Sequence, residues 1–65
     1  MRLTINGEPR DLNAATVAEA LAALDMEGAR VATALNGEFV PAGLRAGRAL
    51  VPGDALEIVA PMQGG

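Results

Sequence analysis

The side chains that usually carry catalysis are nearly absent from this chain. It contains no histidine, cysteine, lysine or serine, the residue types that supply most general bases and nucleophiles. Asp11, Asp54 and Glu57 could form a carboxylate pair for acid–base chemistry, but turn formation and a solvent-facing strand position explain them more simply. No acidic loop offers the clustered oxygen ligands of a metal site. The sequence therefore predicts a protein that is not an enzyme and binds no metal or cofactor of its own.

The remaining group that could take part in chemistry is the carboxylate after Gly64-Gly65. Glycine has no Cβ, so two consecutive glycines can pass through a channel too narrow for side chains. Pro61 lacks an amide hydrogen, so strand pairing should stop there. We expect residues 1–60 to form the domain and residues 61–65 to form a mobile tail.

Length and composition limit the class of protein. Sixty-five residues allow one domain with a small core. The net charge is −3, and nucleic acid is not an expected partner because phosphate contacts need a basic face. No apolar run reaches the roughly 18 residues of a membrane span, and the N-terminal residues lack a signal-peptide pattern. We expect a cytoplasmic protein that does not bind membranes and is monomeric when free.

Two Asn-Gly dipeptides predict two β-hairpins. This dipeptide favours a tight type I′ turn because both residues tolerate positive φ. The first joins a strand over residues 1–5 to a return strand over 8–12, where Pro9 indicates a sheet edge. The second joins a strand over 31–35 to a short return strand over 38–40.

One amphipathic helix is predicted after the first hairpin. Thr16 and Glu19 have the spacing of a capping box, in which the Thr16 hydroxyl accepts from the Glu19 amide and the Glu19 carboxylate reaches back to the Thr16 amide. An apolar stripe at helical spacing follows: Val17, Ala20, Leu21 and Leu24. Gly28 is expected to end the helix, although Asp25 and Glu27 oppose the helix dipole near that end.

The segment over residues 42–49 is expected to be a loop or one short helical turn. Leu44 is its predicted buried anchor, and Arg45 and Arg48 are interpreted as solvated charges. A Pro-Gly-Asp turn then leads into a final strand over residues 56–60, in which apolar and polar side chains alternate.

The two-residue turn of the second hairpin decides which side chains share a face. It places Ala34 opposite Phe39 and Thr33 opposite Val40. If the helix covers the face that bears Thr33 and Val40, then Phe39, Ala34 and Val59 point outward. Because an exposed aromatic side chain beside small apolar residues suits a partner, we predict that these three residues form a docking patch.

The order of elements predicts an α+β architecture. Its simplest packing is one mixed sheet of about five strands with a single helix across one face. A right-handed crossover would make the first strand parallel to a later one. The last strand can then lie beside the first at the centre of the sheet, where both neighbours would give the tail a rigid base.

This order resembles the β-grasp (ubiquitin-like) fold and, within it, the ThiS family of sulfur carriers. The matching pieces cover most of the chain: Ile5-Asn6-Gly7, Thr16-Val17-Ala18-Glu19-Ala20-Leu21, Ala32-Thr33-Ala34-Leu35-Asn36-Gly37-Glu38, Pro52-Gly53-Asp54, Glu57-Ile58-Val59 and Gly64-Gly65. Thr33 departs from the family pattern, where a larger branched apolar residue is expected, and this predicts slightly poorer core packing.

The resemblance implies a specific chemistry at the C-terminus. A ThiF-like adenylyltransferase would use ATP and Mg²⁺ to adenylate the Gly65 carboxylate, and persulfide sulfur would displace AMP to leave a thiocarboxylate. A ThiG-like thiazole synthase would then take the sulfur for the thiazole ring of thiamin. Gly64 would provide clearance, while Pro61, Met62 and Gln63 would line the partner's channel.

Two other functions are compatible with the same fold. A MoaD-like carrier would supply sulfur for molybdopterin, and a ubiquitin-like protein modifier or interaction module would use the same surface without that sulfur transfer. The short chain favours the thiazole carrier, and this preference rests on the family resemblance.

Overall fold

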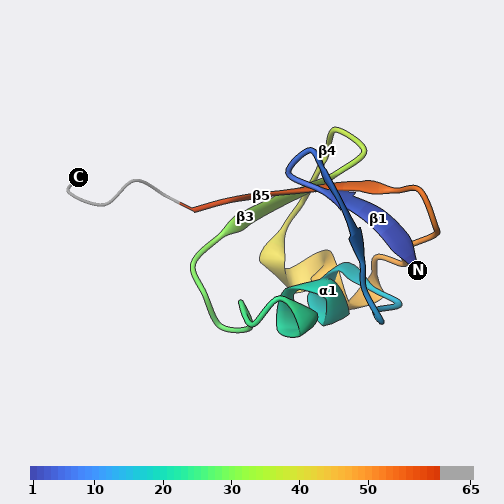
Figure 1. The fold of residues 1–65 in the computed structure, drawn as a ribbon. Helices are drawn as coiled ribbons and strands as arrows, with labels where there is room; N and C mark the ends of the chain where they lie inside the picture. Colours follow the sequence, from blue (N-terminus) through green and yellow to red (C-terminus); the bar gives the residue numbers. More distant parts are fainter. Residues whose placement is uncertain (61–65) are drawn as a thin grey trace.

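The structure is a computed structural model that describes residues 1–60. In this part of the chain, five strands, one α-helix and one 3-10 helix follow one another (Figure 1): β1 (Arg2–Ile5), β2 (Glu8–Asp11), α1 (Val17–Ala23), β3 (Ala32–Leu35), β4 (Glu38–Val40), η1 (Ala42–Gly47) and β5 (Ala55–Val59). Each strand begins and ends within one residue of its predicted bounds.

The strands form one mixed sheet in the order β2-β1-β5-β3-β4. β5 is parallel to β1 and antiparallel to β3, so the last strand lies at the centre as expected. β2 is an edge strand whose four residues are all exposed, in agreement with Pro9. Both α1 and η1 lie on one side of the sheet (Figure 1), and the opposite side is here named the outer face. The predicted α+β arrangement is confirmed.

Both hairpins turn through left-handed backbone at their Asn-Gly pairs. The φ angles are 51° at Asn6, 84° at Gly7, 52° at Asn36 and 83° at Gly37. Positive φ at both central residues is the type I′ geometry, whose twist matches that of the flanking strands. The second turn sets Thr33 opposite Val40 and Ala34 opposite Phe39, as predicted.

The core lies between the sheet and α1. Its largest fully buried apolar side chains are Leu3, Val17, Leu35, Val40 and Leu56. The predicted helical stripe supplies Val17, Ala20 and Leu21 to this core, and Leu24 packs against it while partly buried.

The helix begins at the predicted cap, with one difference. The Thr16 hydroxyl accepts from the Glu19 amide at 3.1 Å. The Glu19 carboxylate, however, accepts from the Ala15 amide at 2.7 Å, so the predicted bond to the Thr16 amide was wrong. Thr16 is extended, with φ −135° and ψ 166°, and this conformation brings the amide of the preceding residue within reach of the carboxylate.

The helix ends earlier than predicted. Its last residue is Ala23, and Asp25 adopts the left-handed conformation with φ 64°. The two backbone bonds of a Schellman motif close the end: Asp25 N to Ala22 O at 3.0 Å and Met26 N to Leu21 O at 2.8 Å. The prediction that Gly28 ends the helix was wrong because aspartate also tolerates left-handed backbone and occurs first.

Leu44 is not the buried anchor of its segment. It lies in η1 with its side chain 62% exposed, so that prediction was wrong, and Leu50 is buried in the core instead. The Leu50 amide donates to the Ala15 carbonyl at 2.9 Å beside an isolated bridge between Thr16 and Ala49. This pairing joins segments distant in sequence, so the local pattern could not reveal it.

Arg45 is not a solvated charge, as the sequence suggested. Its Nε donates to the Thr33 hydroxyl at 3.0 Å, and its Nη2 donates to the Val31 carbonyl. Arg48 is also engaged, in an ion pair with the exposed Glu38 at 2.8 Å. Both arginines therefore tie η1 and its flank to the β3–β4 hairpin.

Candidate functional site

Five predicted site residues lie outside the described part of the chain: Pro61, Met62, Gln63, Gly64 and Gly65. The candidate site can be described from its base, which is β5, and from the outer face beside it. β5 ends at Val59 in the middle of the sheet, so the chain enters residues 61–65 from a strand with a neighbour on each side.

The two hairpin asparagines hold β5 from both sides. Asn6 Oδ1 accepts from the Ile58 amide at 2.7 Å, and Asn6 Nδ2 donates to the Ile58 carbonyl at 3.1 Å. Asn36 Oδ1 accepts from the Ala55 backbone amide at 2.9 Å, and the backbone N–H of Asn36 donates to the Ala55 carbonyl at 2.7 Å. Asn36 thus holds the beginning of β5, and Asn6 holds the end from which the chain continues toward residue 65.

Sequence reasoning identified these asparagines as turn-forming residues and missed their contacts with β5. The contacts join positions 52 and 19 residues apart, which no local pattern predicts. One signal was present: asparagine stands at the first turn position both times, and a carboxamide can donate and accept at once.

The three residues of the predicted docking patch all lie on the outer face. Phe39 is 65% exposed and Val59 is 62% exposed, while Ala34 is half-buried. The register sets Ala34 between Phe39 on β4 and Glu57 on β5. On this face β3 contributes only alanines, and the exposed Phe39 and Val59 lie on the two neighbouring strands, with the exposed Glu57 on the same face.

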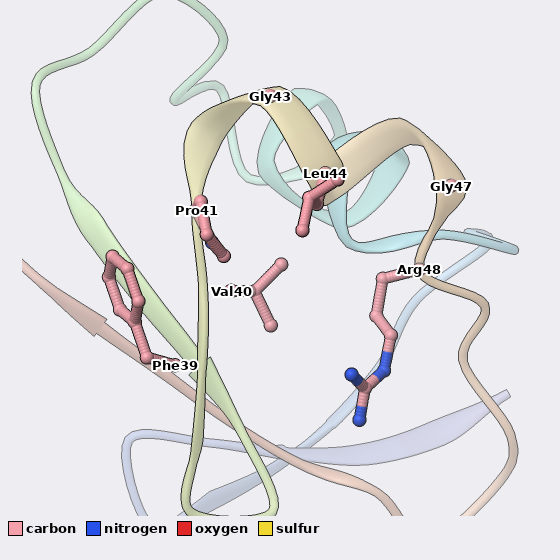
Figure 2. A pocket seen from close by; sticks show the side chains of 7 residues that line it. All are labelled: Phe39, Val40, Pro41, Gly43, Leu44, Gly47 and Arg48. Carbon is pink, nitrogen blue, oxygen red and sulfur yellow. The ribbon is translucent and has the colours of Figure 1, made fainter.

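A hollow of about 280 Å³ lies at the β4 edge, beside Phe39 (Figure 2). Its lining residues are Phe39, Val40, Pro41, Gly43, Leu44, Gly47 and Arg48. The side chains of Val40, Pro41 and Leu44 turn toward one another, with Phe39 on one side and Arg48 on the other (Figure 2). The exposed Leu44 therefore extends the apolar surface from the outer face around the sheet edge.

A second hollow lies where β5 ends. It is lined by Ala29, Arg30, Val31, Ala32, Ala42, Arg45 and Val59. Val59 belongs to both this hollow and the docking patch, so the patch includes the last residue of β5.

The carboxylates do not form a catalytic pair. Asp54 Oδ1 accepts from Asn36 Nδ2 at 3.0 Å and its Oδ2 accepts from the Val51 amide at 2.9 Å, which lowers the pKa of Asp54 below its usual value. Asp11 forms an ion pair with the Met1 amine at 3.2 Å, and Glu57 lies exposed on the outer face. Each carboxylate thus has the turn or surface position predicted for it.

Two further properties concern residues 1–60 alone. No group of three or more acidic side chains there is arranged to hold a metal ion. Neither of the helices in this range is long and apolar enough to cross a membrane.

A sequence model of the ThiS family matches residues 3–65. A thiazole synthase from Paramagnetospirillum magneticum (strain ATCC 700264 / AMB-1) is 44% identical over 66 residues, which cover 100% of this chain and 20% of that protein. The chain therefore spans about a fifth of the length of this relative.

The crystal structure of the thiamine biosynthesis protein ThiS from Geobacter metallireducens has the same fold. It superimposes with a TM-score of 0.83 at 36% identity, and the match covers 100% of both chains. The five-stranded mixed sheet with one helix is thus the β-grasp fold predicted from the order of elements.

Proposed function

We propose, because this chain belongs to the ThiS family of sulfur carriers in thiamine biosynthesis, that Gly65 carries the sulfur as a C-terminal thiocarboxylate. This proposal rests on the observation that the family match extends to residue 65 and therefore includes Gly64-Gly65. The central, doubly held β5 supports the same proposal, since a fixed strand limits where the tail can go. The chain is a carrier acted on by enzymes and not itself an enzyme.

The proposed reaction needs activation of a weak electrophile. Resonance stabilises a carboxylate, so an ATP- and Mg²⁺-dependent, ThiF-like adenylyltransferase attaches AMP to the Gly65 carboxylate and releases pyrophosphate. A persulfide sulfur attacks the acyl carbon and AMP leaves; reductive cleavage of the resulting sulfur–sulfur bond by a thiol releases the thiocarboxylate. Gly64 gives clearance in the partner's channel, which Pro61, Met62 and Gln63 line.

The proposed acceptor is a ThiG-like thiazole synthase. Its support is the relative named thiazole synthase, one fifth of which aligns with this chain. A polypeptide that joins a carrier-like segment to a synthase favours direct delivery between the two. We place the reaction in the cytoplasm, with the carrier monomeric when free.

The docking patch of Phe39, Ala34 and Val59 is the proposed contact for these enzymes. Its support is the exposure of Phe39 and Val59 on the sheet face opposite α1. Burial of exposed aromatic and aliphatic side chains is a common source of binding energy. The patch reaches the end of β5, so a partner that covers it would also meet the tail.

The test is the intact mass of the full chain after incubation with ATP, Mg²⁺, a ThiF-like enzyme, a persulfide source and a thiol reductant. We expect the gain that corresponds to one sulfur atom replacing one oxygen atom. A chain that lacks Gly65 is the control and should not gain it. An unchanged mass of the full chain, while an authentic carrier reacts in parallel, would contradict the proposed function.

A further inference from the structure

Ile58 is the last residue of β5 whose backbone N–H and C=O point toward β1. Alternate residues of a strand direct their backbone groups to opposite neighbours. The Ala55 backbone bonds to Asn36 on the β3 side. The Leu56 carbonyl, in contrast, accepts from the backbone N–H of Asn6 at 3.0 Å on the β1 side. Ile58, two residues beyond Leu56, therefore directs its N–H and C=O toward β1.

The backbone of β1 ends before it can pair with Ile58. The chain turns at Asn6, whose φ is 51°, and continues into β2. The Asn6 carboxamide takes the place of the missing backbone: its Oδ1 accepts from the Ile58 amide and its Nδ2 donates to the Ile58 carbonyl. A carboxamide carries the same donor and acceptor as a peptide group, so this side chain forms the last rung of the β1–β5 ladder.

This rung lies three residues before Pro61. On the other side of β5, Val59 pairs with Ala32 of β3. Within the described residues, the end of β5 is thus held by β3 on one side and by one carboxamide on the other. Loss of that carboxamide would let the strand end pivot about its pairing with β3.

We propose that Asn6 is a positioning residue for the sulfur-carrying tail, because its carboxamide fixes the direction in which β5 leaves the sheet. This inference rests on the proposed function of Gly65. A tail that starts from a fixed strand end loses less conformational freedom when it enters the channel of the adenylating enzyme, and binding is correspondingly stronger.

The experiment compares Asn6→Ala with Asn36→Ala in the full chain. Asn36→Ala is the matched control because it removes the carboxamide that holds the beginning of the same strand. Two properties are measured for each variant: the steady-state kinetics of adenylation by a ThiF-like enzyme, and the rate of hydrogen exchange at the Ile58 backbone amide. We expect Asn6→Ala to raise KM about tenfold, the equivalent of ordering roughly one more backbone residue, with kcat little changed and faster exchange at Ile58.

The control should keep the wild-type KM even though it also loses hydrogen bonds. A wild-type KM for Asn6→Ala, or equal increases for both alanine variants, would overturn the positioning role. If Asn6→Ala does not fold, Asn6→Asp keeps the acceptor for the Ile58 amide and loses the donor; a KM above that of the wild type supports the proposal and a wild-type KM overturns it. A wild-type chain that is not adenylated contradicts the proposed function itself, which is a separate result visible without any variant.

Discussion

At the scale of single residues, Thr33 shows how a polar side chain can occupy a core position. Its side chain is 1% exposed. The hydroxyl donates to the Val40 carbonyl at 2.8 Å and accepts from Arg45 Nε at 3.0 Å, so both of its hydrogen-bonding roles are used. Among the described residues, no buried side-chain polar atom is left without a partner. Thr33 therefore links β3, β4 and η1 where an apolar residue could only fill space.

Thr33→Val should lower stability despite its greater apolarity. It leaves the Val40 carbonyl and Arg45 Nε without this partner, and we expect a loss of about 1 kcal/mol in the free energy of unfolding. Urea denaturation measures the change. Thr4→Val is the control, since Thr4 is a half-buried threonine on β1 outside the core, and it should have little effect. Equal or higher stability of Thr33→Val would show that the hydroxyl contributes nothing.

Asp54 should make stability depend on pH in the acid range. Hydrogen bonds from the Asn36 side chain and then from the Val51 backbone amide lower the pKa of Asp54 in the folded chain below the ordinary value of an aspartate. Folding thus favours the ionised form of Asp54. The contribution of this carboxylate to the free energy of unfolding is fully present above its unfolded-state pKa and is lost as pH falls through the lower folded-state pKa.

Asp54→Asn should remove this part of the acid sensitivity. The free energy of unfolding should fall less between pH 7 and pH 3 than it does in the wild type, by under about 1 kcal/mol because solvent screens the group. Urea denaturation at the two pH values gives the comparison. The same fall in both proteins would mean that the turn does not depend on the charge of Asp54.

Phe39→Asp should weaken adenylation while leaving the fold intact. A charge in the middle of an apolar contact must be desolvated when the partner binds, so KM for the adenylating enzyme should rise. Ala22→Asp is the control because it adds the same charge to the exposed surface of α1, on the other side of the sheet. Circular dichroism checks the fold. If Phe39→Asp is folded and reacts with a wild-type KM, the docking patch lies elsewhere.

At the scale of elements, the parts set by local sequence were predictable and the parts set by distant contacts were not. The Asn-Gly turns fixed the hairpin registers, which set Phe39 on the face opposite Thr33 and Val40, and the burial of those two residues makes that face the outer one. Leu44 was predicted as the buried anchor in place of Leu50, which pairs with Ala15 beside the bridge between Ala49 and Thr16. Arg45 was predicted as a solvated charge because its bond to Thr33 joins residues distant in sequence. The contact of Asn6 with Ile58 was missed for the same reason. The roles proposed for residues 61–65, which include the reactive carboxylate of Gly65, stay predictions from the sequence.

The end of α1 offers a test of local backbone strain. Asp25 stands at the left-handed position where glycine has no steric penalty, and its carboxylate opposes the helix dipole. Asp25→Gly should therefore raise stability by about 1 kcal/mol, the strain and charge gains being partly offset by greater freedom of the unfolded chain. For a domain of this size the midpoint of thermal unfolding should rise by roughly 4–8 °C.

Gly28→Ala is the opposite control for the same loop. Gly28 has φ 82°, so a Cβ there meets left-handed backbone and stability should fall by about 1 kcal/mol. A decrease in the melting temperature of Asp25→Gly would show that the aspartate side chain stabilises the Schellman motif more than the strain and charge oppose it.

At the scale of the whole molecule, the fold places the first and the last strand next to each other at the centre of the sheet. β1 and β5 lie side by side in parallel, and the described core runs from Leu3 to Ile58. The sheet cannot be completed until the last strand has joined it. The strand that leads to Gly65, the proposed site of sulfur attachment, is therefore also the strand on which the sheet depends.

This arrangement predicts that stability and carrier function divide at residue 60. A chain that ends at Ala60 keeps the whole described core, and Pro61 cannot donate to a further ladder bond. We expect its free energy of unfolding to stay within about 0.5 kcal/mol of the full chain, as for changes outside the core. It should show no ATP–pyrophosphate exchange with a ThiF-like enzyme because Gly65 is absent. Thermal unfolding and the exchange assay check the two halves separately, and a markedly lower melting temperature would place part of residues 61–65 in the folded domain.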